Sequence, residues 1–377
     1  MAVSFIHTAD WQIGRAFDSI GGDAAALLRS QRIKTVQRIA QEAAARNVEA
    51  VLVAGDVFEN NLVGNETVHG VLHAMESFKG DWVLIPGNHD PGVAESVWQR
   101  IQSLGTPKNL HLALEPEPIL VADSRLVILP APLRRKHEFE DLTAAWDSID
   151  TPAGAVRVGL AHGSVEGRLP QDSEATNLIN VDRETRARLD YLALGDWHGT
   201  QKVANRTWYC GTPEPDRSKD NDAGNVLLVT IAAPGSQPVV EPLHVAHFTW
   251  TSIAAELNGS EDLGALEAQF SSLGEPFDQY IVSLVVGGTV DFATRELFDR
   301  LLSRWRGRFT SLGDDCLQLV AQPTDADLDR IDSGGFVRTA MENLRAIHAN
   351  PSDPNHKYAT GALRLLYQIH TVGAQTK

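Results

Sequence analysis

The chain has 377 residues, of which 43% are hydrophobic, and a formal net charge of −16. This length exceeds that of one average domain, so we expect two or three domains with substantial cores. The acidic balance argues against a protein that coats nucleic acid through a basic surface, but not against an enzyme that meets phosphates through bound cations.

Cysteine content and hydropathy restrict the cellular setting. The two cysteines, Cys210 and Cys316, are too few for a disulfide framework and are typical of a reducing compartment. No apolar run approaches the roughly 18 residues of a membrane span, and the first residues lack the pattern of a signal peptide. We therefore expect a cytoplasmic protein with no membrane attachment.

Short apolar runs alternate with helical patterns in the first half of the chain. Apolar residues recur at helical spacing over 24–46 and 62–78, which predicts two helices. The apolar runs predict strands that each end in polar residues, at 3–10, 48–56, 81–90, 125–133, 156–163 and 190–198. Strands that alternate with helices indicate parallel pairing, and ligands of such sheets bind beyond the carboxyl ends of the strands.

The pattern changes near residue 246. Strands are predicted at 247–257, 279–288 and 315–323, with helices at 261–273 and 291–306. This βαβαβ order predicts a small α/β domain over 246–330, after a first domain over 1–245. Helices at 335–348 and 358–371 flank a turn rich in Asn, Pro and Asp. They predict a C-terminal helical segment over 331–377, whose apolar side chains face that domain or a partner.

Clusters of polar residues follow five of the predicted strands. A single aspartate after a strand usually caps a turn or a helix, but five clusters at the same end of successive strands indicate a binding site. Carboxylates, imidazoles and amide oxygens together suit Mn²⁺, Fe²⁺ or Zn²⁺, and a pair of such ions is a common means of hydrolysing phosphate esters. The clusters are Asp10-Trp11-Gln12, Gly55-Asp56, Gly87-Asn88-His89-Asp90, His162-Gly163 and Gly195-Asp196-Trp197-His198.

The order of these clusters resembles the motif order of the calcineurin-like metallophosphoesterases. More narrowly, "HTADWQIG", "AGDVFEN", "PGNHD", "AHGSVEG", "LALGDWHGTQ" and "WYCGTPEPD" resemble the SbcD-type DNA repair exonucleases, the nuclease partners of a coiled-coil ATPase. The resemblance covers about residues 1–245. It implies an α/β fold, a four-layer β-sandwich flanked by helices, followed by a smaller α/β capping domain and a C-terminal helical segment.

The resemblance also implies a role for each cluster. Two divalent metal ions, bridged by Asp56, would be bound by Asp10, Gln12, Asp56 and His198 on one side and by Asp56, Asn88, His162 and Asp196 on the other. His89 would not ligate but would protonate the leaving oxygen or stabilise the transition state. Glu59 is the candidate to anchor the second ring nitrogen of His89; a solvated loop glutamate is the alternative.

Two positions depart from the family pattern. Gln12 and Asp196 stand where the family has histidines. A neutral amide is a weaker ligand than an imidazole, and a carboxylate is harder. We therefore expect the preference to shift toward Mn²⁺ or Mg²⁺ and the first metal to be held more loosely. Outside the clusters, Arg134, Arg135 and Lys136 are candidates to contact a DNA backbone, with an exposed basic turn as the alternative.

Three functions remain open from the sequence. The first is a metal-dependent DNA exo/endonuclease that acts in DNA repair with an SbcC-like ATPase partner, with a homodimer expected from the resemblance alone. The second is a phosphodiesterase or phosphatase for a small substrate, with the second domain as a lid. The third is a scaffold that has lost a metal through Gln12 and Asp196.

Overall fold

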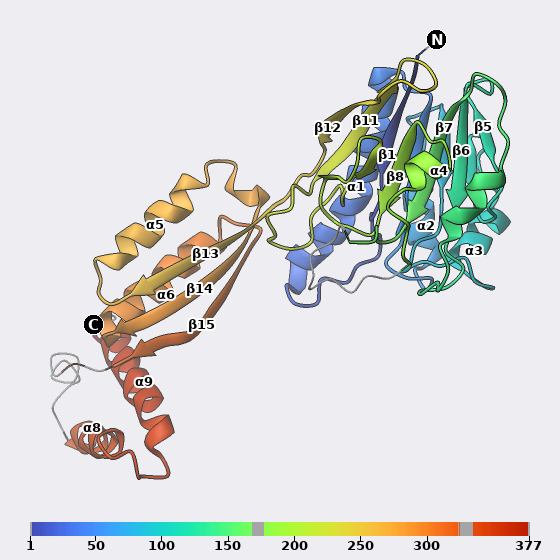
Figure 1. The fold of residues 1–377 in the computed structure, drawn as a ribbon. Coiled ribbons are helices and arrows are strands. Elements are labelled where there is room, and N and C mark those ends of the chain that lie inside the picture. Colours follow the sequence, from blue (N-terminus) through green and yellow to red (C-terminus); the bar gives the residue numbers. More distant parts are fainter. Residues whose placement is uncertain (1, 168–176, 323, 325–334, 376–377) are drawn as a thin grey trace. The chain divides into compact units, whose positions relative to one another are not determined.

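The computed structural model describes residues 2–167, 177–322, 324 and 335–375 (Figure 1). The chain divides into two compact units, residues 1–248 and 249–377. The predicted boundary between a capping domain and a C-terminal segment, at residues 330 and 331, lies outside the described residues.

Two six-stranded sheets form the frame of the first unit. The first sheet has the order β12-β11-β1-β2-β3-β4. Its central strands β1, β2 and β3 run parallel, as the alternation of strands and helices predicts, and β11 pairs antiparallel with β1. The strands are β1 (Val3–Thr8), β2 (Ala50–Val53), β3 (Asp81–Leu84), β4 (Leu110–Leu112), β11 (Asn225–Ile231) and β12 (Val239–His244).

The second sheet has the order β5-β6-β7-β8-β10-β9. Strands β6, β7 and β8 are parallel neighbours, with Ala131 opposite Ala161 and His162 opposite Gly195. The strands are β5 (Ile119–Val121), β6 (Leu126–Ala131), β7 (Val156–His162), β8 (Tyr191–Gly195), β9 (Gln201–Lys202) and β10 (Thr207–Tyr209).

Helices cover the outer face of each sheet. Phe5, Leu52, Ile128 and Tyr191 belong to one buried cluster that joins the two sheets. The helices α1 (Gly22–Arg46), α2 (Asn65–Met75) and α3 (Val97–Leu104) pack on the first sheet, and η1 (Leu142–Ser148) and α4 (Arg183–Arg186) accompany the second. The expected four-layer α/β sandwich is therefore confirmed.

The longest helix of this unit shows why the local sequence forms a helix. In α1, Leu28, Val36, Ile39 and Ala43 are buried at helical spacing, so one face packs on the sheet. The helix ends at Asn47, which adopts the left-handed conformation (φ 51°) and donates its backbone N–H back to the last turn, an arrangement that asparagine tolerates.

The second unit contains a parallel three-stranded sheet of order β13-β14-β15, in which βαβαβ connectivity is confirmed. Phe270, Leu284, Phe298 and Trp305 form its core. Two further helices pack against each other and bury Met341, Leu363 and Tyr367 with Phe292. The elements are β13 (Thr249–Leu257), α5 (Asp262–Ser272), η2 (Phe277–Gln279), β14 (Tyr280–Val290), α6 (Phe292–Arg306), β15 (Ser311–Ala321), α8 (Gly335–His348) and α9 (His356–Gln375).

None of the described helices combines the length and the apolar character that a membrane span requires.

Candidate metal centre

The polar clusters lie at the carboxyl ends of strands from both sheets. Asp10 and Asp56 follow the neighbouring strands β1 and β2, and Asp196 follows β8 of the second sheet. Each has a left-handed backbone, with φ of 53°, 52° and 99°, and Gln12 has φ of 43°. Non-glycine residues rarely adopt this conformation, and such strain is concentrated at functional sites. Here the left-handed conformation changes the direction of the chain at each strand end.

Asp10, Asp56 and His162 form the centre of the site. Each offers a ligand atom, and these atoms lie within 4.8 Å of one another. All three residues are at most 2% exposed. A buried group of two carboxylates and one imidazole is costly unless a cation or a proton balances the charge. The arrangement therefore fits a divalent metal ion.

His162 is oriented for ligation. Its Nδ1 lies 2.8 Å from the carbonyl oxygen of Ala54, so Nδ1 carries the proton in the neutral ring and Nε2 has the free lone pair. Nε2 points toward three oxygens: Asn88 Oδ1 at 2.9 Å, Asp56 Oδ1 at 3.5 Å and Asp196 Oδ1 at 3.8 Å. These four side chains are the set predicted for one metal ion, and the structure brings them together.

Two glycines leave room for this set. A Cβ atom on Gly87 would lie 2.1 Å from Oδ1 of Asp56, and one on Gly55 would lie 2.4 Å from Nδ1 of His162. Gly55 also has a φ of 88°, which side chains disfavour. The glycines of "AGD" and "PGNHD" are thus needed where the backbone passes directly beside Asp56 and His162.

The pKa shifts of the central residues have a common cause. Burial raises the pKa of Asp10 well above its ordinary value, although His162 opposes the shift. Burial would lower the pKa of His162, but the carboxylates of Asp56, Asp10 and Asp196 outweigh it and raise that pKa to about 9. The cluster thus takes up protons when no cation is bound, and a bound cation would displace them.

Asp196 does not cap a helix. Its backbone N–H donates to the Asp10 carboxylate at 3.2 Å, and its Oδ2 accepts a hydrogen bond from Ser164 Oγ at 2.9 Å. Oδ1 is left on the side of His162. Asp196 therefore connects the ends of β1 and β8 and directs one oxygen into the centre.

Gln12 and His198 lie together at the other side of the site. Nε2 of Gln12 is 3.3 Å from Nε2 of His198, and Oε1 of Gln12 accepts a hydrogen bond of 2.9 Å from Arg15. Nδ1 of His198 is 3.8 Å from Asp216 Oδ2. Burial lowers the pKa of His198 to about 4 despite Asp216, so its ring is neutral near pH 7 and can ligate.

Three arginine side chains surround the carboxylate of Asp216. Arg15 lies 3.1 Å away and Arg217 lies 2.9 Å away, with Arg32 at 3.9 Å. Burial opposes ionisation, but the hydrogen bond from Arg217 and the nearby charges of His198, Arg32 and Arg15 lower the pKa of Asp216 to about 2. Neither Asp216 nor Arg15 was predicted as a site residue. The only sequence signal was the motif "WYCGTPEPD", which ends at Asp216.

His89 lies beside the candidate ligands and contacts Asp56 through its backbone. Its backbone N–H donates to Asp56 Oδ1 at 2.9 Å, and its Nδ1 is 3.1 Å from the backbone carbonyl of Glu59. The Glu59 carboxylate is farther away, at 3.9 Å. Glu59, the residue predicted to anchor His89, thus does so through its backbone carbonyl.

Asp90, buried in the same loop, accepts hydrogen bonds from the backbone N–H groups of Phe58 and Gly87 and holds the loop in place.

The predicted basic segment follows β6, whose carboxyl end lies beside that of β7 and His162. Arg134 forms an exposed ion pair with Glu115, while Arg134 and Arg135 line a surface depression of about 290 Å³ with Glu138. Arg135 and Lys136 are exposed. Among the residues that the structure describes, none of these three basic side chains contacts a candidate metal ligand.

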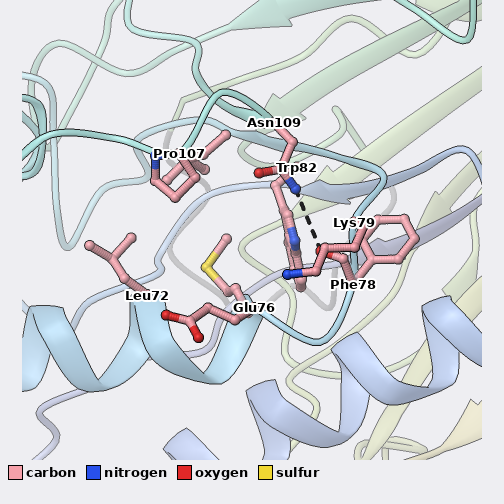
Figure 2. Close-up of a pocket in the computed structure, with 9 residues that line it drawn as sticks. Leu72, Glu76, Phe78, Lys79, Trp82, Pro107 and Asn109 are labelled. Carbon is pink, nitrogen blue, oxygen red and sulfur yellow. Dashed lines mark hydrogen bonds between the residues drawn. The ribbon is translucent and has the colours of Figure 1, made fainter.

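An apolar cavity elsewhere in the first unit is separate from this site. Figure 2 shows it beside Trp82, with Leu72 and Pro107 in its wall. Met75 also lines it, and its volume is about 80 Å³. Trp82 lies near the amino end of β3, whereas Asn88 and His89 follow the carboxyl end of that strand. The cavity is thus at the opposite end of the strand from the ligands.

A two-sheet α/β sandwich with carboxylates, imidazoles and an amide at its strand ends defines a metallophosphoesterase. Residues 3–217 match the model of the calcineurin-like phosphoesterase family, so the chain belongs to that family. The expectation of an enzyme that hydrolyses phosphoester bonds with divalent metal ions is confirmed at the level of the family.

Three curated proteins are similar to the chain. The DNA double-strand break repair protein Mre11 of Methanosarcina acetivorans is 22% identical over 80% of this chain and 49% of its own length. Mre11 of Methanosarcina mazei is 21% identical over 75% and 44%. The uncharacterized metallophosphoesterase YhaO of Bacillus subtilis is 23% identical over 76% and 72%. The chain thus spans about half the length of the two Mre11 relatives.

Proposed function

We propose that the chain is a metal-dependent phosphodiester hydrolase that cleaves DNA as an SbcD-type exo/endonuclease in DNA repair, with Mn²⁺ as the preferred ion. The observation that carries the proposal is the convergence of Asp10, Asp56, Asn88, His162 and Asp196 from strand ends of both sheets. Two of the similar proteins are named as DNA double-strand break repair proteins, which supports DNA as the substrate.

Divalent cations at such a site would lower the pKa of a bound water and neutralise charge on the phosphate. Asp10, Gln12, Asp56, Asn88, His162, Asp196 and His198 are the proposed ligands. The protein holds these donor atoms in place by restricting the orientations of their side chains. Ser164 restricts the rotation of Asp196, and Ala54 fixes the ring of His162.

His89 is the proposed catalytic residue. Its Nδ1 is engaged by the Glu59 carbonyl, so Nε2 is the nitrogen left to face a substrate. The side chain is 34% exposed, which gives a substrate access that the buried ligands lack. From this position a protonated His89 would donate a proton to the leaving oxygen. The hydrogen bond from its backbone N–H to Asp56 fixes its position relative to the proposed ligands.

The C-terminal helices supply the proposed docking surface for a coiled-coil ATPase. Tyr358, Leu365 and Ile369 of α9 are each more than half exposed and recur at the spacing of one helix face, whereas Leu363 and Tyr367 are buried. An exposed apolar stripe on a helix is typical of a surface that packs on another helix. Removal of residues 335–377 should therefore abolish ATPase binding in a pull-down while isolated-chain hydrolysis persists.

The proposal is tested with purified chain, Mn²⁺ and end-labelled single- and double-stranded DNA. Cleavage that a chelator abolishes is the expected result. A chain that hydrolyses bis(p-nitrophenyl) phosphate or a cyclic nucleotide but leaves DNA intact, with and without an SbcC-like ATPase, would instead be a small-substrate phosphodiesterase.

The basic segment has its own test. Charge reversal at Arg135 and Lys136 should weaken DNA binding and reduce its dependence on salt, because phosphate contacts release counterions. Turnover of bis(p-nitrophenyl) phosphate should be unchanged, since that substrate does not reach beyond the metal centre. Equal losses on both substrates would argue that these side chains do not bind DNA.

A further inference from the structure

The amide of Gln12 lies between a guanidinium and an imidazole. One end is 2.9 Å from Nη1 of Arg15, and the other end is 3.3 Å from Nε2 of His198. A guanidinium has donors and no acceptor, so the end of the amide that faces Arg15 must be its oxygen. The nitrogen therefore faces His198. An amide nitrogen of this kind donates hydrogen bonds and does not ligate a cation.

Arg15 is itself fixed in place. The same Nη1 lies 3.1 Å from Asp216 Oδ2 and 3.6 Å from Glu59 Oε2. The backbone N–H of Arg15 donates to the carbonyl of Gln12 at 3.2 Å in a tight turn. Gln12 is 2% exposed, so it has little room to move. Rotating its amide would place an NH₂ group against the guanidinium, two donors facing each other.

His198 is also engaged. Its Nε2, the ring nitrogen on the side of the ligand set, accepts the hydrogen bond from the amide nitrogen of Gln12. Its other nitrogen faces Asp216. A cation at this position would have to break the Gln12–His198 hydrogen bond and approach the positive charge of Arg15. A cation at Asp56, Asn88, His162 and Asp196 would also have to break a hydrogen bond, between His162 Nε2 and Asn88 Oδ1 at 2.9 Å. Among the described side chains, however, no guanidinium forms an ion pair with this set, whereas Arg15 lies against Gln12.

We infer that Arg15 makes the two metal positions unequal by turning the amide nitrogen of Gln12 toward the ligand site. The position at Asp56, Asn88, His162 and Asp196 binds a divalent cation tightly. The position at Gln12 and His198 takes a second cation only after their hydrogen bond opens, and binds it at least about tenfold more weakly, as expected for the loss of one buried hydrogen bond of about 1.4 kcal/mol. This inference rests on the proposed metal-dependent function and concerns the occupancy of its site.

Metal counting tests the inference without measuring activity. The full chain is titrated with Mn²⁺, bound ions are counted by equilibrium dialysis, and paired ions are detected by their spin coupling in electron paramagnetic resonance. Wild type should bind one ion tightly and a second at least about tenfold more weakly. Gln12→Glu is isosteric, keeps one oxygen on Arg15 and turns a second oxygen toward His198. It should bind two ions with similar affinity and show the coupled signal.

A second variant avoids any change in the ligands. Arg15→Met frees the amide of Gln12 to rotate and should strengthen the second position. Arg29→Met is the matched control, because Arg29 also loses one positive charge but contacts the carbonyl of Ala16 and none of the ligands. It should behave as wild type.

The outcomes separate the inference from the proposed function. Two ions of equal affinity in wild type would overturn the inference and leave the function intact. An equal gain in Arg29→Met and Arg15→Met would assign the effect to net charge and would also overturn it. No Mn²⁺ bound in any variant would overturn both.

Discussion

In both units of the molecule an aspartate follows a parallel strand, but the two aspartates differ in backbone conformation and in the groups they contact. Asp291 comes after β14, has a φ of −73°, and accepts a hydrogen bond of 2.7 Å from Thr294 N–H at the start of α6. Asp56 comes after β2, has a φ of 52°, and lies 3.5 Å from His162. The first is a helix cap and the second is a candidate ligand. The residue type does not distinguish them, but its backbone conformation and neighbours do.

The two units also differ in what their cores contain. Among the described residues, the buried polar side chains belong to the first unit with the exception of Thr294. The core of the second unit is built from Leu, Ile, Val, Phe and Trp side chains such as Phe270 and Trp305. The first unit therefore carries the energetic cost of burying polar groups, which the described residues of the second unit largely avoid.

Neutralising Asp56 and Asp291 in turn should give the largest difference in hydrolysis and in metal content. We expect Asp56→Asn to reduce hydrolysis by about 10³-fold or more and to lower the number of bound metal ions, because the proposed bridging carboxylate is lost. Metal content by mass spectrometry and turnover of bis(p-nitrophenyl) phosphate measure both. Asp291→Asn is the control and should leave both unchanged; metal retention by Asp56→Asn would contradict the ligand role.

A smaller effect is expected beside the ligands. His89→Gln should slow hydrolysis by about 10² to 10⁴-fold, since a general acid is removed, while the metal content stays at the wild-type value. Steady-state kinetics and metal analysis on the same preparation separate the two effects. A preparation that loses metal would show that His89 is a ligand.

Acid should affect the first unit more than the second. Burial lowers the pKa of His7 from 6.5 to about 3, although the Leu194 carbonyl opposes the shift. The unfolded chain therefore binds a proton below pH 6.5 that the folded chain refuses. The contribution of His7 to the free energy of unfolding of the first unit is fully present above pH 6.5 and should fall by about 1.4 kcal/mol per pH unit below it.

Urea unfolding between pH 7 and pH 5 checks this slope. His7→Gln removes the titrating ring and should give a shallower dependence on pH, whatever its stability at pH 7. Parallel slopes for wild type and variant would show that His7 does not govern the acid response.

The smallest effect is expected at the cap. Asp291→Ala should lower the free energy of unfolding of the second unit by about 1 kcal/mol, because the N–H of Thr294 loses its partner. Hydrolysis should be unchanged. A loss of hydrolysis in this variant would show that the second unit contributes to the chemistry, and the contrast with Asp56 would then be incomplete.

Local patterns were sufficient to predict the strands that end in the polar clusters and most of the helices, but not the short strands β4, β5, β9 and β10 or the edge strand β12. Asp10, Asp56 and Asp196 each follow an apolar run that is visible within a few residues of sequence. Strand β11 was not predicted, and its position beside β1 depends on pairing across more than 200 residues. Such long-range pairing leaves no signal in a short segment.

The details of the site were harder to predict than its composition. Gln12 was expected to be a weak ligand, but the direction of its amide depends on Arg15 and on His198, which is 186 residues away. The anchor of His89 was expected to be the Glu59 carboxylate, and the structure shows the backbone carbonyl. Backbone groups are common to all residues, so sequence analysis cannot single them out.

The proposed ligands come from strand ends of both sheets, Asp56 and Asn88 from one and His162 and Asp196 from the other. A cation held there is a cross-link between the two halves of the sandwich, comparable in its reach along the chain to a disulfide that closes a loop of more than a hundred residues. Any ion that binds only the folded chain stabilises it by mass action. Metal supply would then set how long the enzyme survives proteases and heat, as well as how fast it works.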